Sequence, residues 1–190
     1  MKCVLMILVF LLGACSSMGE KVVTRMDGLS DRPSWASLSK TMYIKDGQLF
    51  AVGFTEADAN SRLSALARIS DQNARFSISR AITDDMSFIF QNLEEGIQDG
   101  GQLSRFYGNE VSKLVTHGIH DEQRYWEKIQ TFNENGEKEY RLRFYSLVSI
   151  KESDVKEAIK NVLANGNAIS PEIKKQVTEH MVGQIQKFQE

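Results

Sequence analysis

Two histidines that lie close together in the chain are the first group of side chains with metal-binding chemistry. His117 and His120 are followed by Asp121 and Glu122, so imidazole nitrogens and carboxylate oxygens could meet at one ion. Side chains three residues apart converge on one turn of a helix, but Gly118 and the strand-like residues after it are unfavourable for a helix. The pattern therefore predicts a solvated loop, and we expect no metal site.

Other arrangements that could support catalysis are weaker. Glu94 and Glu95 could form an acid–base pair, but adjacent side chains on a helix point in different directions, so a hydrated surface is expected. His180 is expected to be exposed on a C-terminal helix. The chain has no Gly-rich phosphate loop, no Gly-x-Ser-x-Gly sequence and no His-Glu-x-x-His sequence. We therefore expect no catalytic residues and no cofactor.

Three large aromatic side chains suggest a further kind of site. Trp35, Tyr125 and Trp126 could form a platform for a carbohydrate ring. Large aromatic residues at the starts of strands more often pack in the core or at its rim, because they bury a large apolar area. Packing is the favoured interpretation.

Both cysteines, Cys3 and Cys15, lie near the N-terminus. Their position excludes a disulfide framework, a thiol nucleophile and a thiolate metal site in the rest of the chain. Residues 3–12, CVLMILVFLL, are apolar but too few to span a hydrocarbon core, which takes about 20 residues in a helix. Lys2, the short apolar run and the small residues after it are typical of a secretory signal peptide. Residues 1–14 are predicted to form this signal.

The four residues that end at Cys15, LGAC, resemble the bacterial lipobox, in which the cysteine thiol is acylated and the chain is cut just before it. The resemblance implies a mature chain that begins at Cys15 and is anchored by acyl chains such as palmitate. Ser16 follows where an Asp would, by the enterobacterial sorting rule, imply the inner membrane. An outer-membrane anchor on the periplasmic face is therefore expected. Residues 15–33 are predicted to form this lipidated cysteine and a flexible polar tether, with a reach of roughly 20 to 25 Å.

Composition indicates one soluble domain after the tether. The chain has 190 residues, of which 42% are hydrophobic and 25% charged, a length and composition that suit a single core. Positive and negative residues are intermixed and the net charge is −2, so no nucleic-acid partner is expected.

A hairpin is predicted first in the folded part. Residues 42–55, MYIKDGQLFAVGFT, indicate two strands joined at Asp46 and Gly47, a pair that suits a type I′ turn because both residues adopt positive φ. Gly53 within the second strand indicates a sheet that packs closely on a helix.

A long amphipathic helix is predicted over residues 57–82, where apolar residues recur at helical spacing without Gly or Pro. Ile69 and Phe76 are expected to widen its apolar face. The signals in segment 83–118 are weaker and suggest a helix, a flexible loop at 96–102, and a second helix or the approach to a strand.

A second hairpin is predicted over residues 119–150, with Asn135 and Gly136 at its turn. Apolar and polar residues alternate in its second arm, which predicts a sheet with one face on the core and the other largely in water. Helices are predicted over 151–165 and from Pro171 on, where Ser170 is a good N-cap. We therefore expect an α+β fold: a small antiparallel sheet from two hairpins packed against a long amphipathic helix, with additional C-terminal helices.

The order of these features resembles one family. The lipobox, RPSWA at 32–36, the stretch from Leu49 to Ile82 and the late strand YRLRFYSLVSI are similar to the LPP-twenty family of small bacterial outer-membrane lipoproteins. The resemblance implies a family domain over 34–165, followed by a C-terminal helix in 166–190. It contributes no catalytic motif.

The family also implies a role. Its members include flagellar lipoproteins that build disk or ring structures around the motor, so the resemblance implies a non-catalytic, periplasm-facing role in flagellar basal-body or envelope architecture. Its implied partners are the outer-membrane lipid, through acylated Cys15, and proteins of the envelope or further copies of the chain. The alternative is a lipoprotein regulator of a peptidoglycan synthase.

Overall fold

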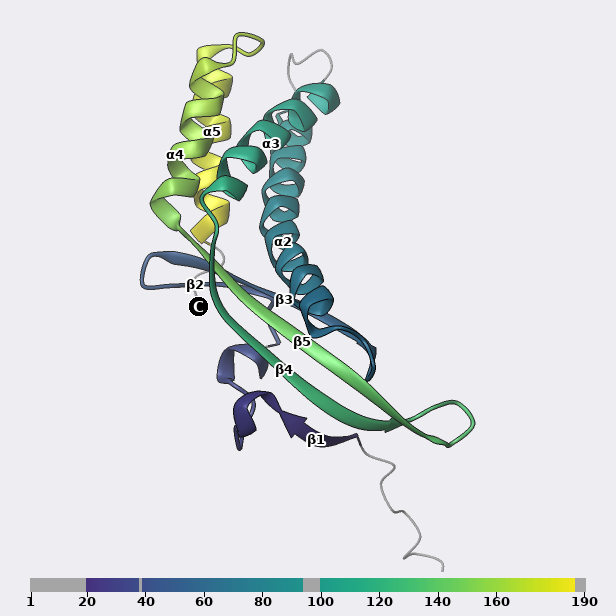
Figure 1. The fold of residues 1–190 in the computed structure, drawn as a ribbon. Helices are drawn as coiled ribbons and strands as arrows, with labels where there is room; N and C mark the ends of the chain where they lie inside the picture. Colours follow the sequence, from purple (N-terminus) through teal and green to yellow (C-terminus); the bar gives the residue numbers. More distant parts are fainter. Residues whose placement is uncertain (1–19, 38, 94–99, 187–190) are drawn as a thin grey trace, which may run out of the picture.

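The structure, a computed structural model, describes residues 20–37, 39–93 and 100–186 and shows the predicted α+β fold (Figure 1). The strands are β1 (Lys21–Arg25), β2 (Met42–Lys45), β3 (Gln48–Asp58), β4 (His120–Phe132) and β5 (Lys138–Lys151). The helices are α2 (Leu63–Asn92), α3 (Gly100–His117), α4 (Glu152–Asn165) and α5 (Pro171–Gln186). Two short 3-10 turns, η1 (Met26–Gly28) and η2 (Ser34–Ser37), follow β1.

The five strands form one antiparallel sheet in the order β1-β4-β5-β3-β2. Both predicted hairpins are confirmed. Asp46 and Gly47, between β2 and β3, have positive φ of 52° and 73°, as a type I′ turn requires. Between β4 and β5, the side-chain oxygen of Asn133 accepts hydrogen bonds from two backbone N–H groups of the loop, and Gly136 has a φ of 77°.

Helix α2 lies across one face of the sheet, which we call the helix face (Figure 1). A Cβ atom on Gly53 would lie 1.9 Å from the backbone oxygen of Ser70 and 2.6 Å from the backbone nitrogen of Ala74, so only glycine permits this approach. The Ser70 hydroxyl donates to the Gly53 backbone oxygen at 2.9 Å. The predicted close packing of sheet on helix is confirmed.

The predicted bounds of this helix are wrong at both ends. Ala57 and Asp58 belong to β3, where they pair with Leu142 and Arg141, because ladder pairing outweighs local helix propensity. At the other end α2 continues to Asn92 without a break, since a line of buried residues continues along it. These residues are Ile78, Ile82, Met86, Ile89 and Phe90.

Helices α3, α4 and α5 complete the main core on the same side. The buried residues of this core come from α2, α3, α4, α5, the β2–β3 hairpin and the end of β5. Segment 103–115, for which the sequence suggests either a helix or the approach to a strand, is helical within α3. Residues 94–99, which include most of the predicted loop, lie outside the described residues. The Ser170 hydroxyl accepts a hydrogen bond from the N–H of Ile173 at 3.3 Å, which confirms the predicted N-cap of α5.

The opposite face of the sheet, which we call the far face, is not open to water as predicted. Tyr145 and Leu147 of β5 are buried there against a second apolar cluster that contains Trp35, Ala36 and Tyr125. The cover is the chain after β1, including η1 and η2, which lies across this face (Figure 1). The central part of β5 is therefore buried on both faces.

The prediction of a flexible tether over residues 15–33 is wrong for the part that the structure describes. Lys21–Arg25 form β1, an edge strand paired with β4 from Gln130 to Glu127. This segment was misassigned because β1 is mostly exposed and has little apolar periodicity, while its pairing depends on the distant strand β4.

Two smaller points concern the surface. Ile69 and Phe76, expected to widen the apolar face of α2, are instead 41% and 63% exposed. Among the residues that the structure describes, no helix has the length and apolar character needed to cross a membrane.

Candidate functional site

The predicted lipidation site, Cys15, lies outside the described residues, but the chain five positions later is held on the sheet. Arg143 Nη1 of β5 donates to Glu20 Oε1 at 2.5 Å, and the backbone of β1 pairs with β4 directly after it. The described chain is therefore attached to the sheet from Glu20 on.

A buried carboxylate holds the segment that follows β1. The Glu127 side chain on β4 has no exposed surface, and both of its oxygens accept hydrogen bonds from the guanidinium of Arg32; Arg32 Nε lies 3.3 Å from Glu127 Oε2. The Tyr125 hydroxyl donates to the same Oε2 at 2.9 Å. We call Arg32, Tyr125 and Glu127 the N-terminal clamp.

Local sequence explains how the clamp is assembled. Tyr125 and Glu127 are two residues apart on β4, so both side chains point to the far face. Arg32 comes from a segment 95 residues earlier in the chain, and its guanidinium carbon lies 5.5 Å from the centre of the Tyr145 ring. The clamp therefore combines a two-pronged charged hydrogen bond with a cation–π contact.

The surroundings of the clamp favour the protonated forms of the Tyr125 phenol and the Arg32 guanidinium. Burial, together with the hydrogen bond to Glu127, raises the pKa of the Tyr125 phenol to about 12. Burial on its own would lower the pKa of Arg32, but the hydrogen bond and the charge of Glu127 outweigh it, so that pKa is raised. Tyr125 thus remains a hydrogen-bond donor and Arg32 a cation at neutral pH.

A second set of charges, which we call the charge ladder, continues across the far face. Its ion pairs, in order, are Glu139–Arg141 at 2.9 Å, Arg141–Glu56 at 2.6 Å, Glu56–Arg143 at 2.6 Å and Arg143–Glu20 at 2.5 Å. Hydrogen bonds to Glu20 and Glu56 raise the pKa of Arg143 although burial opposes the shift. The ladder links β5 and β3 to the residue that precedes β1.

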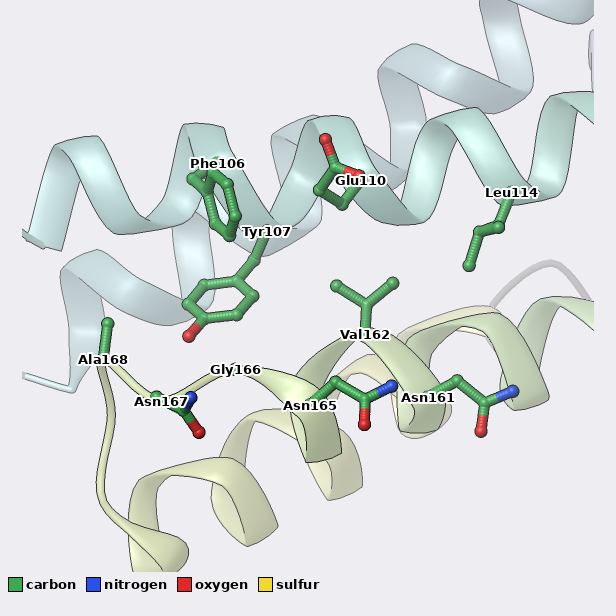
Figure 2. A pocket seen from close by; sticks show the side chains of 10 residues that line it. All are labelled: Phe106, Tyr107, Glu110, Leu114, Asn161, Val162, Asn165, Gly166, Asn167 and Ala168. Atoms are coloured by element: carbon green, nitrogen blue, oxygen red, sulfur yellow. The ribbon is translucent and has the colours of Figure 1, made fainter.

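A groove lies on the opposite side of the molecule, between α3 and α4 (Figure 2). The hollow is about 490 Å³ and is lined by Phe106, Tyr107, Glu110, Leu114, Asn161, Val162, Asn165, Gly166, Asn167 and Ala168. A Cβ atom on Gly166 would lie 2.2 Å from the hydroxyl oxygen of Tyr107, so glycine is required where the loop crosses this ring.

The groove has room for an apolar side chain and contains a single carboxylate. Glu110 is its only charged lining residue, and its carboxylate is 2.6 Å from Lys113 Nζ. The lining contains no Ser, Thr, Cys, Lys or His that could act as a nucleophile or base.

The predicted histidine cluster is divided between two elements. His117 lies in the last turn of α3 and His120 is the first residue of β4. Asp121 pairs with Arg75 at 2.7 Å and Glu122 accepts from Ser149 at 2.5 Å. Within the described ranges, no three His, Cys, Asp or Glu side chains are grouped to hold a metal ion.

The remaining predicted site residues can be placed in part. Trp35 and Tyr125 are buried on the far face, whereas Trp126 packs against Leu66 and Phe144 on the helix face. The predicted packing is therefore confirmed, and the three rings do not form one platform. His180 is exposed, as expected. The two glutamates considered as an acid–base pair, residues 94 and 95, lie outside the described residues.

Two of the clamp residues, Arg32 and Glu127, were missed in the sequence, and Tyr125 was considered only for its aromatic ring. One signal was present: Glu127 stands between Tyr125 and Ile129 in a strand with alternating burial, so it occupies a buried position. A carboxylate at such a position requires a cationic or hydrogen-bonding partner. That partner, Arg32, could not be identified from sequence spacing.

Comparison with protein families, curated proteins and solved structures gives no match to this chain.

Proposed function

We propose that this chain is a non-catalytic lipoprotein, anchored in the outer membrane through acylated Cys15, whose periplasmic α+β body has a structural or assembly role in the cell envelope. The observation that carries the proposal is the LGAC sequence at 12–15, followed after only five positions by a residue bound to the sheet. The resemblance to the LPP-twenty family supports the same role, including a place in flagellar basal-body architecture.

The short connection restricts where the body lies. Five residues span at most about 18 Å when fully extended, so the Cα atoms of Cys15 and Glu20 can be no further apart. The flexible tether over residues 15–33 expected from the sequence would have allowed a wider range of positions. With Cys15 acylated, the β1 edge of the sheet is held next to the lipid surface.

The body suits docking better than chemistry. The α3–α4 groove is lined by Phe106 and Leu114, which are 57% and 51% exposed, and its one charged lining residue, Glu110, is paired with Lys113. Exposed apolar side chains around a hollow are typical of surfaces that bind other proteins.

The alternative, a regulator of a peptidoglycan synthase, is less favoured by the short connection. A body held this close to the outer membrane would need a further element to reach an enzyme in the inner membrane. Recovery of a penicillin-binding protein with the crosslinked lipoprotein would make this alternative the better proposal.

Metabolic labelling with radioactive palmitate tests the anchor. The wild-type chain and Cys3→Ala should carry label and sediment with outer membranes, whereas Cys15→Ala should carry none and leave that fraction. Cys3→Ala is the matched control because the other cysteine lies within the predicted signal. Equal label on Cys15→Ala would contradict the proposal.

A deletion strain tests the role. We expect loss of the gene to change motility or envelope integrity, and the wild-type chain to restore the phenotype while Cys15→Ala does not. Normal motility and a normal envelope in the deletion strain, together with a strictly monomeric chain in sedimentation, would argue against an assembly role.

A further inference from the structure

Half of strand β3 has no neighbour on its outer side. β3 contains eleven residues, but the four residues of β2 pair only with Gln48 to Ala51. The outer edge from Gly53 to Asp58 is therefore beyond the end of β2. β2 is the last strand in the order, so no further strand of the described sheet pairs with this part of β3.

The backbone hydrogen bonds of neighbouring residues show which groups of β3 point outward. Val52 N–H donates to the Thr41 oxygen, on the β2 side, at 2.8 Å. Ala59 N–H donates to the Tyr140 oxygen, on the β5 side, at 3.2 Å. Because direction alternates along a strand, the even-numbered residues of β3 face outward.

The outward groups at the open edge are only partly satisfied. The Phe54 oxygen accepts from Asn73 Nδ2 of α2 at 2.8 Å, and the Asp58 oxygen accepts from Ser61 N–H at 2.9 Å. Among the described residues, the N–H groups of Phe54 and Glu56 have no backbone partner on this side. Such an edge is a template for another strand.

Exposed apolar side chains flank the open edge. Asn73 marks the side of α2 that overhangs Phe54, and Ile69 and Phe76 lie one turn before and one turn after it on that side. They are 41% and 63% exposed. On the far face, the Phe54 ring packs on Tyr145 at 5.1 Å and is itself 44% exposed.

The charge around the edge favours an acidic ligand. On the far face a hollow of about 370 Å³ adjoins Phe54 and is lined by Arg32, Lys40 and Arg143 but by no carboxylate. Arg32 and Arg143 are already paired, whereas Lys40 forms no ion pair with the described residues. Of the two edge carboxylates, Glu56 is bound by Arg141 and Arg143, and Asp58 accepts from the N–H of Asn60.

We propose that the open edge of β3 binds an extended segment of a partner protein as a sixth strand. Apolar side chains of that segment cover Ile69 and Phe76 on the helix side, and acidic side chains on the alternate positions face Lys40 on the far face. Backbone hydrogen bonds supply the affinity and the two flanks supply the selectivity. A second copy is the other possible occupant of this edge, and the dependence of protection on protein concentration distinguishes it from a partner segment.

Strand addition at β3 rests on the proposed assembly role for its biological partner, but the binding itself does not require acylation of Cys15. The test uses the purified full-length chain in detergent micelles and a synthetic ten-residue peptide of alternating Val and Glu. Hydrogen exchange resolved at Phe54 and Glu56 is the readout. We expect the peptide to slow exchange at both amides by at least about tenfold, and the Cys15→Ala chain to behave identically.

Matched controls test separately the backbone pairing, the preference for acidic side chains and the apolar contact with α2. A peptide N-methylated at every residue should give no protection, because neither of its edges can pair with the ladder. A Val–Lys peptide should bind about threefold to fivefold more weakly, and Lys40→Glu should reverse that preference. Phe76→Ser should weaken binding, whereas Phe88→Ser, which changes a similarly exposed ring elsewhere on α2, should not.

Three outcomes would overturn the proposal. One is an unchanged exchange rate at Phe54 and Glu56 with every peptide. Another is equal binding of the N-methylated peptide, which would exclude strand addition. The third is protection that rises with protein concentration in the absence of peptide, which would assign the edge to a second copy. Loss of palmitate labelling on the wild type would contradict the lipid anchor and leave these results unaffected.

Discussion

The two faces of the sheet are stabilised by different means. On the helix face, aliphatic and aromatic side chains pack against α2, whose closest approach is made possible by Gly53. On the far face, a small aromatic cluster is closed by a segment that Arg32 attaches to the buried Glu127. The first face depends on nonpolar area and shape, whereas the second depends on one pairing between residues far apart in the chain.

This difference predicts that the faces respond to different substitutions. A change in side-chain size should disrupt the helix face, since a close-packed interface cannot absorb added volume. Removal of one charge should disrupt the far face, because an unpaired buried carboxylate is strongly unfavourable.

The largest effect is expected for Gly53→Val. Its Cβ would collide with the backbone of Ser70 and Ala74, atoms that cannot move unless α2 shifts. We expect the free energy of unfolding to fall by about 5 kcal/mol or more, or the chain not to fold. Urea denaturation followed by circular dichroism measures the loss.

Gly183→Ala is the control for that substitution. A Cβ on Gly183 of α5 meets no atom within 4 Å, so this change should stabilise the helix by about 0.5 to 1 kcal/mol. A Gly53→Val chain as stable as wild type would show that α2 does not press on the sheet as described.

The next largest effect is expected for Arg32→Ala. The change leaves Glu127 buried and without its cation, so the free energy of unfolding should fall by about 3 to 5 kcal/mol. Hydrogen exchange should accelerate first in β1 and η2, which the clamp holds, before the helix face is affected.

A double-mutant cycle sharpens this expectation. Glu127→Gln should cost less than Arg32→Ala because Arg32, which is 30% exposed, can turn to water. The loss of unfolding free energy in the double variant should be smaller than the sum of the losses in the two single variants. The difference measures the interaction energy between Arg32 and Glu127. Additive losses would mean that the two side chains do not stabilise each other.

The contrast between the faces also explains what could be predicted from the sequence. Both hairpins, the close approach at Gly53 and the N-cap at Ser170 follow from local residue types, and each is confirmed. The helix-face core follows from periodicity, although the bounds of α2 do not, because ladder pairing draws Ala57 into β3.

The far face could not be predicted in the same way. Alternation in β5 suggested a wet surface, since Arg141 and Arg143 share that face with the buried Tyr145. The cover comes from residues that resemble a polar tether, and they become ordered structure only through contacts with β4 and β5. The candidate clamp is a long-range pairing, and local patterns carry no information on such a pairing.

High pH should weaken the far face through Tyr125. Its pKa is raised to about 12, mainly by burial, from an ordinary value of about 10. The folded state therefore holds this proton more tightly than the unfolded state, so the stabilisation is complete below about pH 10 and is lost as the pH rises to about 12. Two pKa units correspond to at most about 3 kcal/mol of unfolding free energy.

Urea denaturation between pH 9 and pH 12 measures this loss, and Tyr125→Phe should remove most of it. Burial also raises the pKa of the Tyr145 phenol, so Tyr145→Phe is the companion variant. A Tyr125→Phe chain with the pH profile of wild type would assign the alkaline loss to other groups.

The smallest effect is expected for Glu20→Gln, and it tests whether the far face depends on charge in general or on the buried clamp. Glu20 and Arg143 form an ion pair, but their side chains are 38% and 20% exposed, so water and salt screen the attraction. Its loss should cost only about 0.5 kcal/mol, and the cost should fall further in 1 M salt, where the Debye length is about 3 Å. Arg32→Ala should be nearly insensitive to salt, because the carboxylate that it leaves unpaired is buried. If Glu20→Gln instead costs as much as Arg32→Ala, the charge ladder and the clamp act as one network, and the far face depends on its charges collectively.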